Sequence, residues 1–280
     1  MIRVIVGDCR QTLQDLPAGS VDCCVTSPPY WSLRDYGSAQ QIGQEASLTA
    51  YIRELVQVFR QVRRVLVARG TVWLNLGDRY DGKQLAGIPW RVALSLQADG
   101  WILRQDVIWS KPNPMPESVT DRCTKAHEYI FLLSVQEDYY YDAAAMQEPA
   151  RSTQVKRQRT HKYAEADATT DHRLARNLLR LSGRKWTTRN RRTVWQVAVS
   201  NTSGNHYAPF PVALIDPCIR AGVPAGGTVI DPFAGSGTVG VAAAAAGRSA
   251  LLLECNPEYA VASCRRIAAE GYPVNIEGIT

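Results

Sequence analysis

The sequence has few of the residues that build metal sites or disulfide frameworks. It contains four histidines and seven cysteines, and no two cysteines form a Cys-x-x-Cys pair. An odd number of thiols without metal-ligand spacing supports neither a zinc site nor a set of disulfides. We therefore expect no metal and reduced, mostly buried thiols.

Long apolar runs are absent as well. No stretch approaches the ~18 apolar residues that span a bilayer, and residues 1–6 lead into a strand-like pattern rather than a signal peptide. Hydrophobic residues make up 45% of the chain, which is typical of a globular protein. These features predict a cytoplasmic protein with no membrane partner.

Positive charge is concentrated in one segment. Residues 151–192 contain thirteen Lys or Arg and three acidic residues, whereas the net charge of all 280 residues is only +6. The remainder is therefore net acidic, and the basic segment is where we expect an anionic partner to bind. A disordered charged linker is the alternative interpretation. The leucines at 174, 178, 179 and 181 favour a packed helix instead.

Strand-like and helix-like segments alternate on both sides of a polar region at residues 142–200. Apolar runs predict strands at 4–6, 21–25, 71–76, 103–109, 128–134, 228–230 and 249–253. Helical spacing predicts helices at 11–16, from Ser47 to near Gly70, and at 88–97, 211–220, 238–246 and 257–269. This alternation predicts an α/β fold whose mainly parallel sheet is covered on both faces.

The segment Thr26-Ser27-Pro28-Pro29-Tyr30 ends the apolar run at 21–25. Two consecutive prolines give up two backbone donors and fix the backbone, so nearby carbonyls are available to a bound group. Tyr30 offers a flat face for stacking. The segment thus predicts a site that accepts hydrogen bonds from a substrate amine. A rigid exit from the strand is the alternative.

A glycine-rich loop, Gly235-Ser236-Gly237-Thr238-Val239-Gly240, follows a predicted strand and matches G-x-G-x-x-G, with Glu254 about twenty residues further on. Taken alone, this fingerprint predicts a nicotinamide-dependent oxidoreductase. Asp231 at the mouth of the loop would repel a pyrophosphate and suits the cationic end of S-adenosylmethionine. Glu254 serves either cofactor, because both present a ribose diol.

Asp231-Pro232-Phe233-Ala234-Gly235-Ser236-Gly237-Thr238, together with Ser27-Pro28-Pro29-Tyr30, resembles the amino-methyltransferases of DNA. The order of the motifs is similar to that of the circularly permuted β group. The resemblance implies a Rossmann-like, permuted methyltransferase sheet with a basic target-recognition insertion. Residues 1–141 would form its catalytic half, 142–200 the target-recognition region, and 201–280 the cofactor-binding half.

The resemblance also implies the cofactor, S-adenosylmethionine, and its contacts. The glycine loop would wrap the methionine part, Glu254 would bind the ribose hydroxyls, and Asp8 would contact the adenine. For Phe210, an ordinary aromatic anchor at a helix entry is the alternative. The implied contacts are Asp8, Cys9, Phe210, Asp231, Phe233, Gly235, Ser236, Gly237, Thr238, Glu254, Cys255 and Asn256.

The catalytic residues implied by the resemblance are Ser27, Pro28, Pro29 and Tyr30. After the target nucleotide is flipped out of the duplex, Tyr30 would stack on the base while Ser27 and the Pro28 carbonyl accept the amine hydrogens. A serine at this position resembles the N4-cytosine members of the family, so we favour cytosine over the alternative, N6 of adenine. Residues 111–118 would approach the same base, with a structural Pro-rich loop as the alternative.

The partner implied is double-stranded DNA, bound through phosphate contacts by the basic segment. By analogy with the family we also expect a homodimer and a cognate restriction endonuclease. A DNA-binding protein with an inactive site remains the other alternative. The residues predicted to bind DNA are Arg157, Arg159, Lys162, Arg184, Lys185, Arg189, Arg191 and Arg192.

Overall fold

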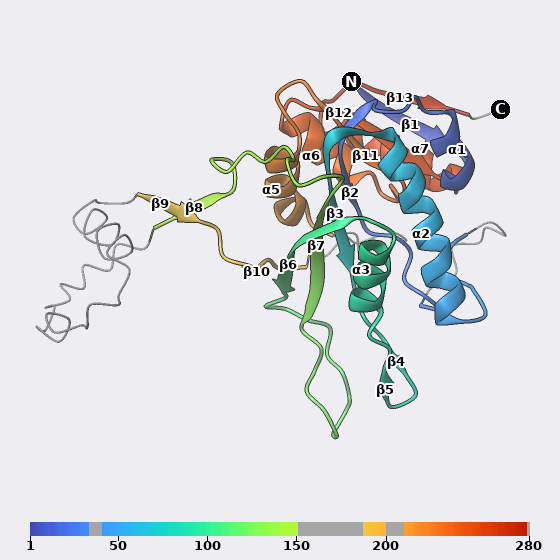
Figure 1. Ribbon diagram of the computed structural model, residues 1–280, viewed down its shortest axis with the longest axis vertical. Coiled ribbons are helices and arrows are strands. Elements are labelled where there is room, and N and C mark those ends of the chain that lie inside the picture. Colours follow the sequence, from blue (N-terminus) through green and yellow to red (C-terminus); the bar gives the residue numbers. More distant parts are fainter. Residues whose placement is uncertain (34–40, 151–186, 200–209, 279–280) are drawn as a thin grey trace, which may run out of the picture. The chain divides into compact units, whose positions relative to one another are not determined.

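A nine-stranded sheet organises the computed structural model, which describes residues 1–33, 41–150, 187–199 and 210–278 (Figure 1). The strand order is β10-β6-β7-β3-β2-β11-β12-β1-β13. The strands are β1 Ile2–Val6, β2 Val21–Thr26, β3 Leu66–Leu76, β6 Ile102–Ser110, β7 His127–Ser134, β10 Val194–Gln196, β11 Thr228–Asp231, β12 Ser249–Glu254 and β13 Val274–Glu277. Neighbours pair in parallel except at β7, which is antiparallel to β3 and β6. The predicted α/β fold with a mostly parallel sheet is confirmed.

Helices cover both faces of this sheet, as Figure 1 shows. Alternate residues of a strand point to opposite faces, so Cys23 and Val25 pack in the core beneath α5–α7 while Cys24 packs beneath α1–α3. The helices are α1 Cys9–Asp15, α2 Leu48–Val65, α3 Ile88–Ala98, α5 Val212–Gly222, α6 Thr238–Ala245 and α7 Pro257–Ala269. None of the helices in the described ranges is long and apolar enough to cross a membrane.

Helix α2 begins where the sequence predicts and ends earlier. The Ser47 hydroxyl accepts a hydrogen bond of 3.2 Å from the Ala50 amide, which caps the first turn. The expectation that the helix continues to near Gly70 is wrong. Leu66 already pairs with Val21, so β3 starts one residue after the helix ends. Sheet pairing overrides helix propensity here.

Several strands have no clear counterpart in the sequence pattern. β10 and β13 lie at the two edges of the sheet, and neither is predicted. A short hairpin, β4 Tyr80–Asp81 with β5 Gln84–Leu85, is also unpredicted. Such strands of two to four residues carry too few alternating side chains to give a signal.

Distant parts of the chain form one sheet. β2 pairs with β11, and β1 lies between β12 and β13. The chain divides into two compact units, residues 1–146 with 192–280, and residues 147–191. In the second unit the described residues form β8 Gln147–Pro149 paired with β9 Thr188–Asn190. The helix predicted around Leu174 lies outside the described residues, and a recognition role for 142–200 stays a prediction.

Candidate active site

Four neighbouring parallel strands of the sheet, β2, β11, β12 and β1, end at one edge. Their last residues are Thr26, Asp231, Glu254 and Val6. The Ser-Pro-Pro-Tyr segment, the glycine loop and Asp8 therefore follow strands that end side by side. Ligands of open α/β sheets bind at this carboxyl edge. The fold thus brings together the predicted catalytic segment and most of the predicted cofactor contacts.

Thr26 and Asp231 join the two motifs directly. The Thr26 hydroxyl donates a 2.6 Å hydrogen bond to the Asp231 carboxylate, and the Phe233 amide donates one of 3.0 Å. Both Thr26 and Asp231 are buried. Burial raises the pKa of Asp231 to about 7, although these two hydrogen bonds act in the opposite direction. The carboxyl group is therefore poised to lose its proton near neutral pH.

The glycine loop folds back onto the end of β12. The Gly235 amide donates a 2.8 Å hydrogen bond to the Glu254 carboxylate. Gly237 has a φ of +74°, and a Cβ there would lie 2.8 Å from the Cβ of Ser263 on α7. Only glycine fits a left-handed backbone this close to a helix. The Arg266 side chain on α7 donates to the Ser236 hydroxyl at 2.9 Å and to Thr238 at 2.9 Å.

Glu254 is the acid at the end of β12. Its carboxylate also accepts a 2.9 Å hydrogen bond from the Asn256 amide and a contact from the Cys255 thiol at 3.6 Å. Burial raises its pKa, and the backbone donors oppose that shift. A carboxylate has about four lone-pair positions, so capacity is left for hydroxyl donors. Asn256 caps α7 by accepting from the Glu258 amide at 2.9 Å.

Asp8 follows β1 and caps α1. Its carboxylate accepts from the Arg10 amide at 2.9 Å and forms an ion pair of 2.7 Å with the Arg10 side chain. Arg10 also contacts Glu54 at 3.3 Å. The adjacent Cys9 is buried, and burial raises the pKa of its thiol well above the ordinary value. Asp8 and Cys9 lie at the predicted edge, and their contact with a cofactor stays a prediction.

The Ser-Pro-Pro-Tyr segment, which is predicted to be catalytic, is held by a polar cluster that sequence patterns do not reveal. Tyr30 donates a 2.7 Å hydrogen bond to Glu128 on β7, and the Ser27 hydroxyl lies 3.4 Å from the Tyr30 hydroxyl. The Asn75 amide on β3 donates to both Tyr30 and Glu128. Lys111 pairs with Glu128 at 2.5 Å. The available signal is a polar residue in or next to an apolar run: Asn75 lies within one, and Glu128 directly precedes one.

The two prolines of the segment differ in their surroundings. Pro28 is buried, whereas Pro29 is partly exposed. The Tyr51 hydroxyl on α2 donates a 2.9 Å hydrogen bond to the Pro29 carbonyl. This carbonyl is therefore already engaged within the protein.

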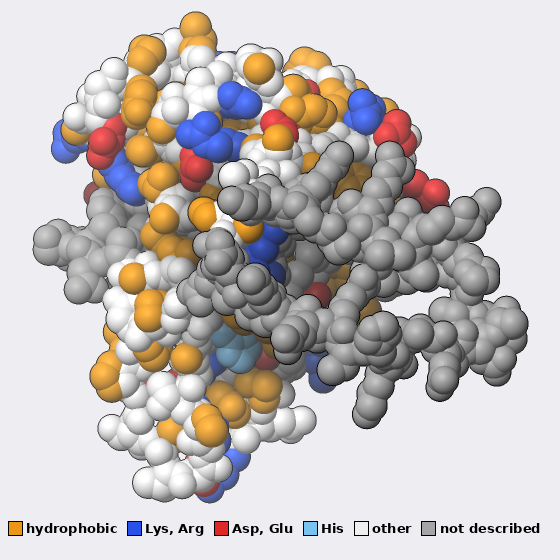
Figure 2. All heavy atoms as spheres, turned by 90° about the vertical axis from the view of Figure 1, so that its left-hand side faces the viewer, with side chains coloured by type: hydrophobic (Ala, Val, Ile, Leu, Met, Phe, Trp, Pro, Cys, Tyr) orange, Lys and Arg blue, Asp and Glu red, His pale blue; other side chains and the backbone are white. Residues whose placement is uncertain are grey.

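Phe210 and the residues predicted to bind DNA do not directly follow any of the four strands β1, β2, β11 and β12 in the sequence. Phe210 is partly buried against the core beneath α5–α7. Arg189 on β9 pairs with Glu148 on β8 at 2.8 Å, and Arg191 and Arg192 follow. On the face shown in Figure 2, the visible basic side chains are interspersed with acidic ones. The predicted contacts outside the described residues are Arg157, Arg159, Lys162, Arg184 and Lys185.

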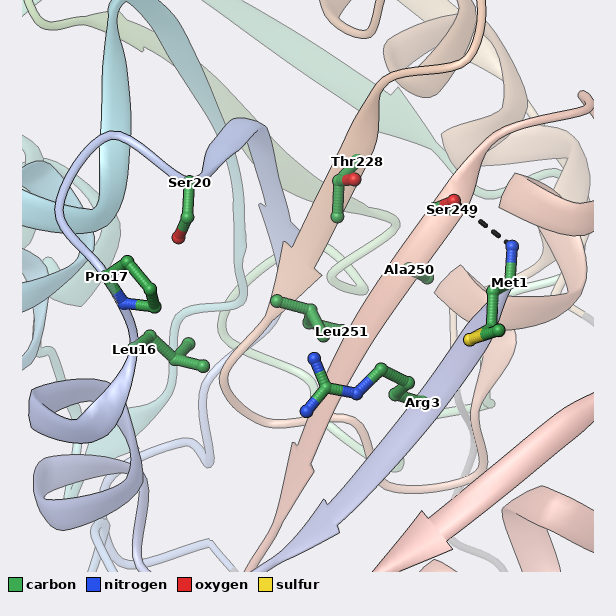
Figure 3. A pocket seen from close by; sticks show the side chains of 9 residues that line it. All are labelled: Met1, Arg3, Leu16, Pro17, Ser20, Thr228, Ser249, Ala250 and Leu251. Atoms are coloured by element: carbon green, nitrogen blue, oxygen red, sulfur yellow. Dashed lines mark hydrogen bonds between the residues drawn. The ribbon is translucent and has the colours of Figure 1, made fainter.

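A cavity of about 330 Å³ lies at the opposite ends of these strands, where β11 and β12 begin (Figure 3). Its lining includes Thr228 and Ser249, where β11 and β12 begin, and Arg3 on β1. Beside it the Met1 amine donates to the Ser249 hydroxyl at 3.1 Å. None of the predicted site residues that the structure describes lines this cavity, so it is separate from the candidate active site.

Comparisons with known proteins agree on one family. The family model for DNA methylases matches residues 21–264. The Type II methyltransferase M.SmaI of Serratia marcescens is 42% identical over 294 residues, which cover 95% of this chain and 90% of that protein. Among solved structures, TTHA0409 of Thermus thermophilus, complexed with S-adenosyl-L-methionine, is 26% identical with a TM-score of 0.67, covering 99% of this chain and 100% of that one.

A second solved structure shows the same fold at lower sequence identity. PvuII DNA methyltransferase, which is cytosine-N4-specific, has a TM-score of 0.69 and 18% identity, covering 98% of this chain and 94% of that one. The methyltransferase sheet expected from the motifs is confirmed.

Proposed function

Because this chain belongs to the N6/N4 family of DNA methylases, we propose that it methylates the exocyclic N4 amine of cytosine in double-stranded DNA. One observation carries the assignment of the site. Ser27 directly follows β2, which pairs with β11, the strand that ends in Asp231. The Ser27 hydroxyl lies 3.4 Å from the Tyr30 hydroxyl. The serine itself favours cytosine through its resemblance to N4-cytosine enzymes. Methylation of N6 of adenine is the second candidate.

S-adenosylmethionine is the cofactor of this family, and when bound it supplies the methyl group. The residues at the carboxyl edge fit it chemically. The buried carboxylate of Asp231 suits a cationic amino-acid end, and the Glu254 carboxylate retains acceptor capacity for ribose hydroxyls. Among the described residues, no atom would lie within 4 Å of a Cβ added at Gly235, so this part of the chain leaves the loop open on that side. The nicotinamide alternative has no support from the relatives.

The catalytic segment acts on the amine by positioning it. Once the nucleotide has left the stack, the Tyr30 ring stacks on the base. The Ser27 hydroxyl and the Pro28 carbonyl then accept the two amine hydrogens, which draws the nitrogen lone pair out of conjugation with the ring. Asp231, the glycine loop and Glu254 would hold the cofactor, which would supply the methyl group from its sulfonium and leave as a neutral thioether, while the amine would give up one proton. Holding two reactants in this geometry supplies most of the acceleration, and no covalent intermediate with the enzyme forms.

Residues 142–200 would supply DNA binding and sequence recognition. Support comes from the concentration of positive charge in this part of the chain. Basic side chains contact phosphates and set affinity, while a few others distinguish base edges. We also propose, by analogy with Type II relatives, a restriction endonuclease that cuts the unmethylated sequence, and a homodimer.

The test is mass spectrometry of nucleosides from the DNA of a methylation-deficient host that expresses the protein. The Ser27→Ala variant is measured in parallel, with Ser20→Ala, an exposed serine before β2, as the matched control. We expect N4-methylcytosine with the unaltered protein and Ser20→Ala, and a large loss with Ser27→Ala. N6-methyladenine instead would replace cytosine by adenine. Methylation that persists in Ser27→Ala would contradict the role of Ser27. If no methylated base appears with any of the three proteins, a DNA-binding protein with an inactive site would be favoured.

A further inference from the structure

Three elements converge on the hydroxyl end of Tyr30. Glu128 is the second residue of β7, Asn75 lies near the end of β3, and Lys111 directly follows β6. The Glu128 carboxylate accepts hydrogen bonds of 2.7 Å from Tyr30, 2.7 Å from Asn75 and 2.5 Å from Lys111. Because β7 runs antiparallel to its neighbours, its beginning meets the ends of β3 and β6. The reversed strand is therefore what delivers an acid to this edge.

Glu128 is ionised in this position. The Glu128 and Lys111 side chains are only 12% and 19% exposed. Burial alone would raise the pKa of Glu128, but Lys111 and the hydrogen bonds from Tyr30 and Asn75 outweigh it, so the pKa lies below the ordinary value. Hydrogen bonds to an ionised acceptor are roughly twice as strong as neutral ones. The Tyr30 hydroxyl is therefore held firmly.

The ring of Tyr30 is confined on another side by Gly77. A Cβ at Gly77 would lie 2.6 Å from Cε2 of Tyr30, so the ring packs directly against this backbone. Pro29, the residue before Tyr30, is fixed as well, because the Tyr51 hydroxyl donates a 2.9 Å hydrogen bond to its carbonyl. Part of Tyr30 nevertheless remains exposed. The ring is thus anchored at its hydroxyl and at one edge.

We propose that Glu128 is a positioning residue for methyl transfer. It fixes the Tyr30 ring in the orientation that receives the extruded base, and Lys111 and Asn75 in turn hold the carboxylate. This inference rests on the stacking role proposed for Tyr30. Among the contacts of Glu128, the hydrogen bond from the Tyr30 hydroxyl is the one that reaches the Ser-Pro-Pro-Tyr segment, so loss of Glu128 should affect a step after cofactor binding. A pre-oriented ring spares the complex the cost of ordering it when the base arrives.

A double-mutant cycle tests this pathway. Tritium transfer from saturating, methyl-labelled S-adenosylmethionine to DNA of a methylation-deficient host gives kcat for the wild type, Glu128→Gln, Tyr30→Phe and the double variant. We expect Glu128→Gln and Tyr30→Phe each to lower kcat about tenfold, the effect of one charge-assisted hydrogen bond. In the Tyr30→Phe background the hydroxyl is already gone, so Glu128→Gln should change kcat less than about twofold. The cofactor Kd from equilibrium dialysis should stay within about twofold in all four proteins.

The control is Glu137→Gln, an exposed glutamate just beyond β7, which should retain full activity. If Glu128→Gln lowers kcat by the same factor in both backgrounds, or changes kcat in neither, the inference is overturned. Loss of cofactor binding in Glu128→Gln would show a merely structural role and also overturn it. Activity of the wild type and Glu137→Gln in the same assay separates these results from failure of the proposed function, which would appear as no transfer by any of the proteins.

Discussion

The hydroxyl of Thr26 donates a 2.6 Å hydrogen bond to the carboxylate of Asp231, 205 residues further along the chain. Thr26 is the last residue of β2, which leads into the Ser-Pro-Pro-Tyr segment, and Asp231 is the last residue of β11, which leads into the glycine loop. Both side chains are buried. One buried hydrogen bond therefore links the segment predicted to bind the amine to the loop predicted to bind the cofactor.

The Thr26→Val variant should lose stability in a pH-dependent way. The pKa of Asp231 is about 7 in the folded chain and lower in the unfolded chain, so its contribution to wild-type stability is full below pH about 4 and is lost as the pH rises to about 7. Valine keeps the shape of threonine and removes the donor. We expect the free energy of unfolding in urea to fall by about 1 kcal/mol at pH 5 and by about 2–3 kcal/mol at pH 8.5, where the carboxylate is ionised. Equal losses at the two pH values would contradict this prediction.

Cofactor affinity should depend on the ionisation of Asp231. Burial and the nearby Glu254 raise its pKa to about 7, so below that pH the group is mostly neutral and attracts an ammonium weakly. We expect the affinity for S-adenosylmethionine to rise between pH 5.5 and 7.5, approaching tenfold per unit at the acid end, and to level off above. Asp231→Asn should bind more weakly with a flat profile. Isothermal titration calorimetry at several pH values measures both, and an unchanged slope in the variant would assign the titration to another group.

Arg266 should support binding of the amino-acid end of the cofactor. Its side chain holds the Ser236 and Thr238 hydroxyls at 2.9 Å each, and these residues are predicted to wrap the methionine part. We expect Arg266→Met to weaken S-adenosylmethionine about tenfold and to leave 5′-methylthioadenosine, which lacks that end, within about twofold. Arg265→Met, at an exposed position on the same helix, is the matched control. Equal weakening of both ligands would indicate general damage to the pocket.

Gly77→Ala should separate cofactor binding from methyl transfer. The added Cβ would lie 2.6 Å from the Tyr30 ring, which must then move from its hydrogen bond with Glu128. We expect methyl transfer to DNA to fall at least about tenfold while the Kd of the cofactor is unchanged. The tritium assay measures methyl transfer by the variant, and equilibrium dialysis measures its Kd for the cofactor. Full activity would mean that the ring position is not critical.

DNA affinity should depend on the basic residues that follow β9. Removing one side chain that binds a phosphate lowers the slope of log affinity against log salt by about one. Arg192→Ala is therefore expected to weaken binding of unrelated duplexes equally and to reduce that slope, as measured by fluorescence anisotropy between about 50 and 200 mM salt. Arg53→Ala, an exposed arginine on α2, removes the same charge elsewhere. A similar change in both variants would reflect net charge alone.

Local patterns predict the parts of this site that are continuous in sequence. The Ser-Pro-Pro-Tyr segment and the glycine loop could be identified because each follows an apolar run with turn residues at fixed spacing. The pairing of Tyr30 with Glu128 could not, since the two are 98 residues apart and meet only through the sheet. The direction of β7 is equally hidden, because alternation of side chains is the same in parallel and antiparallel strands. Asp8 shows a further limit of sequence reasoning. Its ion-pair partner, Arg10, lies only two residues away, but whether the two side chains meet depends on their geometry.

The place of β1 in the sheet bears on when the enzyme becomes active. Its neighbours on both sides, β12 and β13, come from the last 32 residues of the chain. A ribosome therefore releases the first strand long before its partners exist, and β2 likewise waits for β11. Pairing over such sequence separations is slow and leaves strand edges open meanwhile. Activity must accordingly lag behind synthesis, because a chain that still lacks β11 and β12 also lacks the glycine loop and Glu254.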